Sequence, residues 1–275
     1  MSKKPRVLFI SQEMYPYLPD SKISKTIRNL TQGTQESGKE IRTFIPRYGC
    51  INERRHQLHE VIRLSGMNII INDTDHPLII KVASLPAARM QVYFIDNEEF
   101  FQRKHVHHGA NGKFFEDNDE RAIFFCRGVI ETVKKLGWQP DIIHCHGWMT
   151  SLVPAYIKKA YADEPMFANA KVVYSAYNDA FDKPFDKSFV NKAVINGVSA
   201  TDLKAGKDAT HSALNKLAIQ YSDGVIIGEE GVSADIHKYI KTSGKPTVTF
   251  ADENTYIQEF NNFYQAVLEE SEVVV

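Results

Sequence analysis

The segment 141–154 constrains the fold more than any other part of the chain, because an apolar run, a glycine and a second apolar run follow one another there. Residues 141–145 read Asp-Ile-Ile-His-Cys, and Gly147 precedes the run that begins at Trp148. This pattern is typical of a buried strand that enters a sharp turn and then a helix. In open α/β sheets, ligands bind at such turns, at the carboxyl ends of the strands.

The same alternation runs through most of the chain. Short apolar runs predict further strands over 6–11, 41–46, 171–175, 224–228 and 246–250. Apolar residues at helical spacing predict helices over 23–37, 119–136, 148–161, 210–221, 233–241 and 254–270. Repeated strand–helix–strand units predict an α/β fold, with a Rossmann-like, doubly wound and mostly parallel sheet.

Residues 60–96 have a different pattern. Four short β-type runs, 61–64, 68–71, 78–82 and 91–95, are separated by turn residues such as Ser65-Gly66 and Asn72-Asp73. This pattern predicts a β-hairpin or meander inserted in the α/β framework. Residues 97–104 are expected to form a short helix, and 105–117 a polar loop.

The chain has 275 residues, which is enough for one large core. We find no internal repeat and no low-complexity linker, so we predict one domain over 1–250 and a C-terminal helix with an acidic tail over 251–275.

The charge and the cysteines exclude several classes of protein. Lys and Arg number 33 and Asp and Glu 34, so we expect neither a nucleic-acid nor a membrane partner. No signal peptide and no apolar run of membrane-spanning length is evident. Three widely spaced cysteines, Cys50, Cys126 and Cys145, argue against a disulfide framework and favour the reducing cytoplasm.

Several ordered segments together resemble the N-terminal half of bacterial glycogen and starch synthases, which are two-domain glycosyltransferases of the GT-B type. The segments that carry the resemblance are 7–17, 45–49, 118–125 and 136–148, which read VLFISQEMYPY, IPRYG, NDERAIFF and LGWQPDIIHCHGW. The resemblance covers residues from about 5 to about 236 and implies that the chain is half of a GT-B fold. It also implies glucosyl transfer from ADP- or UDP-glucose to an α-1,4-glucan as the family activity.

The first loop departs from the family pattern. The family carries Lys-x-Gly-Gly there, in which the lysine faces the donor phosphates and the glycines allow close approach of backbone N–H groups. The same register in this chain holds Pro19-Asp20-Ser21-Lys22. Lys22 is therefore a candidate phosphate contact, although a solvated lysine at the start of a helix is the preferred interpretation.

Two further turns have also changed. The family pattern His-Asp-Trp-His becomes His146-Gly147-Trp148-Met149, and the His-Asn pair after the next strand becomes Tyr177-Asn178. The resemblance thus makes His146, Trp148 and Asn178 candidate cleft residues. Gly147, Met149 and Tyr177 are degenerate positions, so no catalytic residue is assigned.

These departures shape the functional hypotheses. The resemblance implies that the donor-binding C-terminal half lies beyond this sequence, so the chain is expected to be inactive alone. One hypothesis is a glucosyltransferase half that works with a separate C-terminal-half protein and binds an α-glucan or a sugar nucleotide. The alternative is a non-catalytic module that binds a glucan, a metabolite or a protein in glycogen metabolism. An unrelated Rossmann-like nucleotide binder is disfavoured because the first turn is not glycine-rich.

Other polar residues have competing interpretations. Glu13 either contacts an acceptor hydroxyl or accepts hydrogen bonds from nearby backbone. Arg47 and Tyr48 either line an acceptor groove or, for Arg47, pair with a carboxylate.

The histidines and Cys145 have mostly structural interpretations. His144 and His146 face the same side of their strand, one packed and one at the mouth of the cleft. With no third ligand nearby, no metal site and no cofactor is predicted. Cys145 is expected in the core. His105, His107 and His108 could bind a metal, but a solvated surface run is the preferred interpretation.

Overall fold

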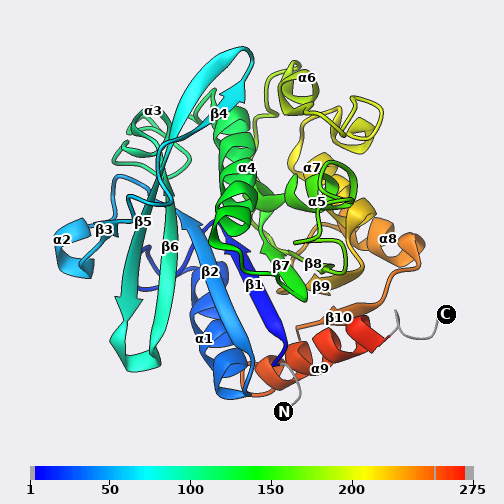
Figure 1. Cartoon of the computed structure of the whole chain (residues 1–275). Coiled ribbons are helices and arrows are strands. Elements are labelled where there is room, and N and C mark those ends of the chain that lie inside the picture. The colour runs from blue at the N-terminus through cyan, green and yellow to red at the C-terminus, as the bar shows by residue number, and fades with distance from the viewer. Residues whose placement is uncertain (1–3, 251, 270–275) are drawn as a thin grey trace.

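The computed structural model describes residues 4–250 and 252–269, which form a large, mostly parallel sheet with helices on both faces (Figure 1). Across the sheet the strands are ordered β10-β9-β8-β7-β1-β2-β6-β5-β3, and β4 pairs with β5 off this path. Their bounds are β1 Arg6–Ser11, β2 Glu40–Pro46, β3 His59–Glu60, β4 Met67–Ile71, β5 Thr74–Leu85, β6 Met90–Asp96, β7 Ile142–His146, β8 Lys171–Ala176, β9 Gly224–Ile227 and β10 Thr247–Thr249. The expected α/β fold class is confirmed.

Strand β1 lies in the middle of the parallel part of the sheet. It pairs in parallel with β2 on one side and with β7 on the other, and residues 7–11 are buried. Burial on both faces explains why β1 and β7 read as apolar runs rather than as alternating patterns. The chain leaves β1 toward β2 and later returns to β7, so the topological switch point lies between β1 and β7.

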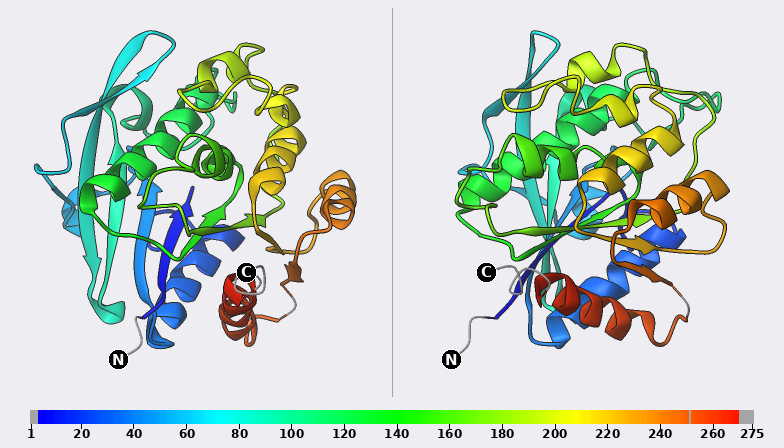
Figure 2. Two further views of the ribbon diagram at one scale, coloured as in Figure 1. Left: turned by 45° about the vertical axis from the view of Figure 1, so that its right-hand side comes forward. Right: turned by 90° about the vertical axis from the view of Figure 1, so that its right-hand side faces the viewer.

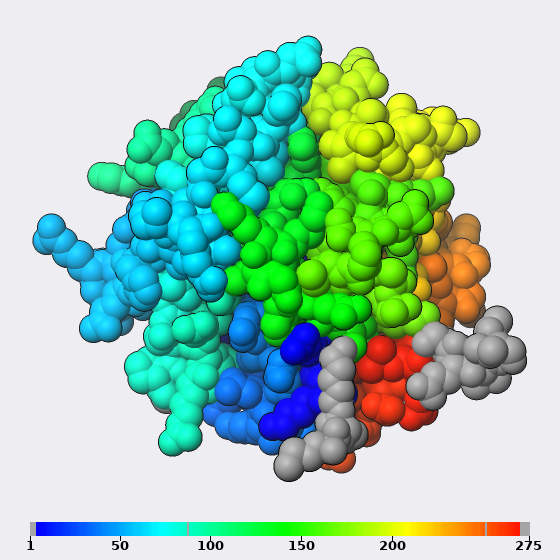
Figure 3. All heavy atoms as spheres, in the orientation of Figure 1, coloured from blue at the N-terminus to red at the C-terminus, as the bar shows by residue number. Residues whose placement is uncertain are grey.

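The predicted insertion is present, but it is smaller than expected. Strand β5 pairs antiparallel with β3, β4 and β6, and the β4–β5 hairpin projects at the top of the molecule (Figures 1 and 3). Strand β6 pairs in parallel with β2 and therefore belongs to the framework. The strand expected over 61–64 is wrong: these residues form turns, and Ile62 is 74% exposed.

Helices cover both faces of the sheet. The α-helices are α1 Lys22–Glu36, α2 Glu53–His56, α3 Glu98–Phe101, α4 Asn118–Leu136, α5 Val153–Lys159, α6 Phe189–Ala193, α7 His211–Tyr221, α8 Ala234–Ser243 and α9 Tyr256–Glu269. Short 3₁₀ turns are η1 Pro86–Ala88, η2 Trp148–Thr150 and η3 Lys204–Gly206. Helices α1 and α9 lie on one face, and α4, α5 and α7 lie on the other (Figure 2).

The single helix expected over 148–161 is wrong. The segment forms η2 and then, after residues 151 and 152, α5. Pro154 stands in the first turn of α5. A proline has no N–H to donate and is favoured at a helix start, so it begins a new helix rather than continuing the first. The short helices α2 and α6 were not predicted, because four or five residues carry too little periodicity.

The C-terminal helix α9 shares the core of the rest of the chain. Phe260 and Tyr264 are fully buried, and a Cβ added to Gly33 of α1 would stand 2.5 Å from the Ile257 side chain. The Tyr264 hydroxyl lies 2.7 Å from His144 Nδ1 on β7. The division of the chain at residue 250 stays a prediction, and the part of the expected helix and acidic tail that falls on residues 251 and 270–275 lies outside the described residues.

None of the described helices is both long enough and apolar enough to cross a membrane.

Candidate functional site

The candidate site is at the carboxyl ends of the parallel strands. Loops 12–21, 97–117, 147–152 and 177–188 follow β1, β6, β7 and β8, and all begin at this edge of the sheet. The edge spans the switch point between β1 and β7, where an open α/β sheet offers a crevice for ligands.

Asp179 joins three of these loops. Its Oδ2 accepts hydrogen bonds from Gln12 Nε2 at 3.1 Å and from the Trp148 backbone N–H at 3.2 Å. Its Oδ1 lies 2.7 Å from His211 Nε2. Gln12 Oε1 in turn accepts from the Met149 N–H at 3.2 Å. The carboxylate and the amide therefore satisfy the backbone donors of the turn after β7.

Gly147 is the only residue type that fits this turn. Its φ of 80° and ψ of 167° lie in a region that is essentially restricted to glycine. An added Cβ would stand 2.4 Å from Gln12 Oε1 and 2.9 Å from Asp179 Oδ2. A carboxylate is thus present beside the position where the family pattern has one, but it comes from the loop after β8.

The two histidines of β7 are buried and stacked. Their ring centroids are 3.7 Å apart, which confirms that they face the same side of the strand, and neither side chain is exposed. His144 lies between Tyr264 and Ser175 Oγ, 2.7 Å from each hydroxyl, and His146 Nδ1 lies 2.9 Å from the Tyr177 hydroxyl. The expectation that one histidine stands at the mouth of the cleft is wrong.

Burial keeps both rings neutral. It lowers the pKa of His146 to about 3, and it lowers the pKa of His144 well below its usual value, with a smaller contribution from His146. Cys145, on the opposite side of the strand, is buried as expected. In the described part of the chain, no group of three or more His, Cys, Asp or Glu residues could hold a metal ion.

Trp148 and Met149 are buried beneath the loop 105–117. The His107 ring packs 4.9 Å from the Trp148 ring, and the Tyr48 hydroxyl lies 3.1 Å from His107 Nε2 and 3.2 Å from the Met149 sulfur. Burial, with the nearby Arg121 charge, lowers the pKa of His107 well below its usual value. The expectation that His107 belongs to a solvated run is therefore wrong, whereas His105 and His108 are exposed.

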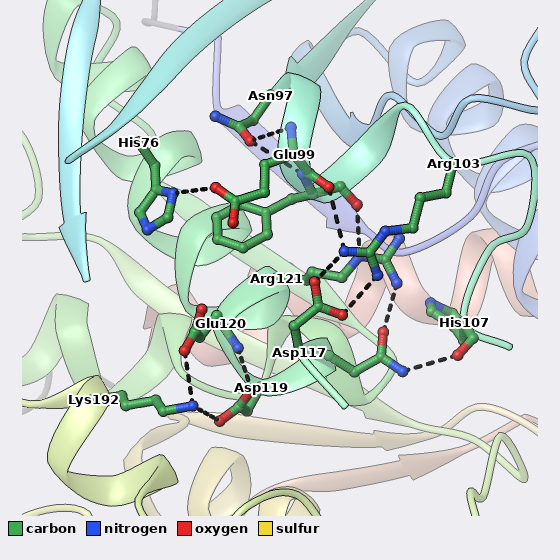
Figure 4. Close-up of polar contacts among 12 residues, drawn as sticks. His76, Asn97, Glu99, Arg103, His107, Asp117, Asp119, Glu120, Arg121 and Lys192 are labelled. Atoms are coloured by element: carbon green, nitrogen blue, oxygen red, sulfur yellow. Dashed lines mark hydrogen bonds and ion pairs between the residues drawn. The ribbon is translucent and has the colours of Figure 1, made fainter. Parts of the chain in front are cut away.

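A polar network fixes that loop to the start of α4 (Figure 4). Both guanidinium NH groups of Arg103 donate to Asp117, and Asn118 Nδ2 donates to the His107 carbonyl at 2.9 Å. Arg121 is fully buried and donates to Asn118 Oδ1 at 2.5 Å and to the Phe100 carbonyl at 2.8 Å. Burial lowers the Arg121 pKa to about 10. The segment 118–121 thus serves to hold the loop.

Glu13 lines a small cavity at this edge, which we name the Glu13 cavity. It measures about 310 Å³, and its lining residues are Glu13, Leu18, Pro19, Asp20, Ser21, His105, Val106, His107 and His108. The Ser21 hydroxyl donates to the Glu13 carboxylate. Burial raises the Glu13 pKa; the Ser21 bond opposes this, and the charges of Asp179 and Glu229 add to it.

Lys22 and Asn178 flank this region. The ammonium group of Lys22 lies 2.5 Å from a Glu253 carboxylate oxygen and 3.5 Å from the centre of the Phe250 ring. The expected solvated lysine is therefore only about one quarter exposed along its side chain. Asn178 is exposed, and its backbone N–H donates to Glu229 at 2.7 Å.

Arg47 and Tyr48 do not line a groove. Arg47 is paired with Glu53 at 2.5 Å and Asp96 at 3.2 Å, and Lys81 bridges the same two carboxylates. Tyr48 is fully buried. The interpretation of Arg47 as a carboxylate partner is confirmed, and the acceptor-groove interpretation of both residues is wrong.

Sequence reasoning missed Gln12, Asp179 and His211. Gln12 lies within the resemblance segment 7–17 but received no role there, and Gln12 and Asp179 are 167 positions apart in the chain. Their places in the loops after two predicted strands would have put Gln12 and Asp179 at the same edge of the sheet.

Known proteins resemble much of this chain. Residues 6–245 match the family described as "Starch synthase catalytic domain". The glycogen synthase of Chlorobium limicola is 39% identical over 177 residues, and that of Chlorobaculum tepidum is 40% identical over 174. Both matches cover 63% of this chain and 36% of the relative, so the matched part spans about a third of those proteins.

A solved structure shows the same fold. The catalytic domain of starch synthase IV from Arabidopsis thaliana, bound to ADP and acarbose, superposes with a TM-score of 0.74 at 18% identity. The match covers 91% of this chain and 52% of that chain, as expected for one half of a GT-B fold.

Proposed function

The chain belongs to the starch synthase catalytic domain family, and on that premise we propose that its Glu13 cavity binds the end of an α-glucan that serves as acceptor for glucosyl transfer. The donor in this proposal is ADP- or UDP-glucose. Transfer requires a donor-binding half, either on a separate protein or on a longer chain, and the 275 residues by themselves are inactive.

The main support is how the polar groups at the strand ends are used. His146 is bonded to Tyr177, and Gln12 and Asp179 are bonded to the turn at Gly147, so these groups face one another rather than a ligand. Glu13 and Ser21 line an open cavity of about 310 Å³ beside them. A carboxylate and a hydroxyl in a small hollow with the apolar walls Leu18 and Val106 suit a sugar ring, which has hydroxyl edges and apolar faces.

Calorimetric titration with maltotriose tests the acceptor site. We expect binding by the wild-type chain and at least tenfold weaker binding by Glu13→Gln, because a hydrogen bond to a charged group contributes about 1.5–3 kcal/mol. Glu98→Gln, an exposed carboxylate on α3, is the matched control and should bind like the wild type. Wild-type binding that is unchanged in Glu13→Gln would place the sugar elsewhere.

A transfer assay tests the inactivity. The chain is incubated with labelled ADP-glucose or UDP-glucose and glycogen, first alone and then with an extract that contains a candidate donor-binding half. Label should enter glycogen only in the mixture. Incorporation by the purified chain alone would contradict the proposal.

A non-catalytic glucan-binding or regulatory module is the second candidate, and the surroundings of Lys22 favour it. Its ammonium group is engaged by Glu253 and Phe250 rather than presented to a phosphate. A shift of the melting temperature with maltotriose but not with ADP-glucose, and no transfer in any mixture, would select this candidate.

We also propose a cytoplasmic location. Cys50, Cys126 and Cys145 are all free thiols, as is usual in a reducing compartment. Non-reducing electrophoresis of protein trapped with a thiol reagent in cells tests this.

A further inference from the structure

A hollow at the opposite edge of the sheet is separate from the candidate site. It measures about 620 Å³, and we name it the basic hollow. Its lining residues are Lys4, Gln35, Gly38, Lys39, Glu40, Ile41, Arg42, Arg89, Met90 and Gln91. The parallel strands β1, β2 and β6 begin at this edge, which is the lower one in Figure 1, whereas the candidate site lies at their carboxyl ends. The basic hollow therefore shares no lining residue with the Glu13 cavity.

The basic hollow carries an excess of positive charge. Its charged lining residues are four cations and one carboxylate, namely Lys4, Lys39, Arg42, Arg89 and Glu40. None of the four cations forms an ion pair with another described residue, and Glu40 is already paired with Arg6 at 3.0 Å. The whole chain has a formal net charge of only -1, so this excess is local. Clustered cations without counter-charges attract anions.

Two polar atoms of these lining residues lack a hydrogen-bond partner. They are Arg42 Nε and Gln35 Oε1, which are both buried and unpaired among the described residues. Buried polar groups are normally paired, so the arginine lacks an acceptor here and the glutamine lacks a donor. The ammonium group of Lys39 has the Ser37 hydroxyl at 3.2 Å as its partner rather than a carboxylate, and burial lowers the Lys39 pKa.

Neighbouring residues hold Arg42 and Gln35 in place. The guanidinium carbon of Arg42 lies 5.4 Å from the centre of the buried Trp138 ring, and its Nη1 donates to the Ile41 carbonyl at 3.0 Å. Gln35 Nε2 donates to the Arg89 carbonyl at 3.4 Å. Side chains that are already positioned lose little conformational entropy when a ligand binds.

A phosphate group with a hydroxyl-bearing substituent matches both features of the basic hollow. The phosphate oxygens accept hydrogen bonds from arginine and lysine, and a hydroxyl donates to the oxygen of a glutamine side chain. The volume of the hollow lies in the range of small-molecule sites. We propose that the basic hollow binds a small phosphate ester that carries hydroxyl groups. This inference is independent of the proposed function, because it uses no residue of the Glu13 cavity.

Calorimetric titration of the full chain at constant pH and ionic strength tests the proposal. The probes are ribose 5-phosphate, inorganic phosphate and ribose. We expect ribose 5-phosphate to bind several-fold more tightly than inorganic phosphate, because its ribose hydroxyls reach Gln35, and we expect no binding of ribose. Arg89→Met changes an exposed side chain and should weaken the binding of both anions at least about tenfold, since a hydrogen bond to a charged group is lost.

Further variants keep the test valid if Arg89→Met folds poorly. Lys39→Met should also weaken the binding of both anions several-fold. Gln35→Leu removes the unpaired acceptor, so it should abolish the preference for ribose 5-phosphate and leave the binding of inorganic phosphate unchanged. Arg63→Met changes an exposed arginine that does not line the hollow, and this matched control should bind both anions like the wild type.

The outcomes separate this proposal from the acceptor site. No binding of either anion, binding that Arg89→Met and Lys39→Met leave unchanged, or an equal loss in Arg63→Met would overturn the basic hollow as an anion site. Equal binding of ribose 5-phosphate and inorganic phosphate by the wild type would overturn the assignment of an ester. Glu13→Gln should bind both anions like the wild type, so its effect on maltotriose concerns the acceptor site alone.

Discussion

Oδ2 of Asp179 lies 2.9 Å from the point that a Cβ on Gly147 would occupy. The two residues lie 32 positions apart in the chain and follow neighbouring strands, β7 and β8. Because Gly147 has no side chain, the Asp179 carboxylate can occupy the space beside it. There the carboxylate accepts a hydrogen bond from the Trp148 N–H. The turn and the loop after β8 are therefore matched to each other, and neither residue can change alone without cost.

Replacing Gly147 should destabilise the fold. Gly147→Asp restores the family residue, but it forces a non-glycine residue into a glycine-only conformation and places its carboxylate beside Asp179. We expect a loss of roughly 3 kcal/mol in the free energy of unfolding, measured by urea denaturation.

The double variant Gly147→Asp/Asp179→Ala controls for the charge repulsion. Its loss should be smaller than the sum of the two single losses, because one source of repulsion is absent. Strict additivity would show that the two sites do not interact.

Removing the Asp179 carboxylate should be nearly as costly. Asp179→Ala leaves the Trp148 N–H, the Gln12 amide and His211 without their acceptor, and unmet buried donors cost about 1–3 kcal/mol. We expect the free energy of unfolding, measured by urea denaturation, to fall by about 2–3 kcal/mol. Asp182→Ala, an exposed aspartate of the same loop, should change stability by less than about 0.5 kcal/mol. Equal losses in the two variants would contradict the role given to Asp179.

The free energy of unfolding should decrease as the pH is lowered, because of the stacked histidines. The pKa of His146 is about 3 in the folded chain, against 6.5 for an ordinary histidine, so the unfolded chain binds a proton first as pH decreases. Its contribution is fully present above about pH 6.5 and is lost progressively as pH falls toward 3, by about 1.4 kcal/mol per pH unit. His144 and His107 act in the same direction, since burial lowers their pKa values too.

Urea denaturation at several pH values between 5 and 7 measures this slope. His146→Gln should reduce the slope by nearly one proton. Tyr177→Phe removes the hydroxyl that contacts His146 but keeps the imidazole, so its slope should match that of the wild type even if its stability is lower. An unchanged slope in His146→Gln would mean that this histidine titrates alike in both states.

The contact between α9 and β7 should contribute to stability. Tyr264→Phe removes the hydroxyl that lies 2.7 Å from His144 Nδ1 and leaves a buried ring nitrogen without that partner. We expect a loss of about 1–2 kcal/mol in the free energy of unfolding, measured by urea denaturation. Tyr239→Phe on α8 provides the control for loss of a tyrosine hydroxyl. If Tyr264→Phe loses no more unfolding free energy than Tyr239→Phe, the hydrogen bond to His144 contributes little to stability.

The sequence predicts the framework well because burial on both faces of a parallel strand leaves an unambiguous apolar run. Strands β1 and β7 are such runs, and the cap at Gly137, with φ of 64°, ends α4 where the pattern stops. Residues 61–64 are apolar at three of four positions but form turns beside the β4–β5 hairpin, with Ile62 exposed and Leu64 buried. An apolar run shows β propensity, but it does not reveal whether a pairing partner is available.

The candidate site is less predictable, since it depends on contacts between distant loops. His146 reads as a cleft residue until Tyr177 and Phe9 are seen to enclose it. His107 reads as a surface residue in a polar loop, yet Tyr48 and Trp148 pack against it and leave it only partly exposed. Spacing along the chain gives the edge of the sheet at which a side chain stands. It does not give the neighbours that compete for its hydrogen bonds.

The bond between Tyr264 and His144 has a consequence for biosynthesis. One face of the central strands is covered partly by α9, which is made after all the strands of the described sheet. Until α9 leaves the ribosome, His144 on β7 lacks its partner Tyr264. The apolar surface that Phe260 covers is then open to water. A nascent chain therefore cannot complete this core before α9 has emerged, and a ribosome stalled before residue 256 would expose a partly covered apolar face of the sheet to chaperones.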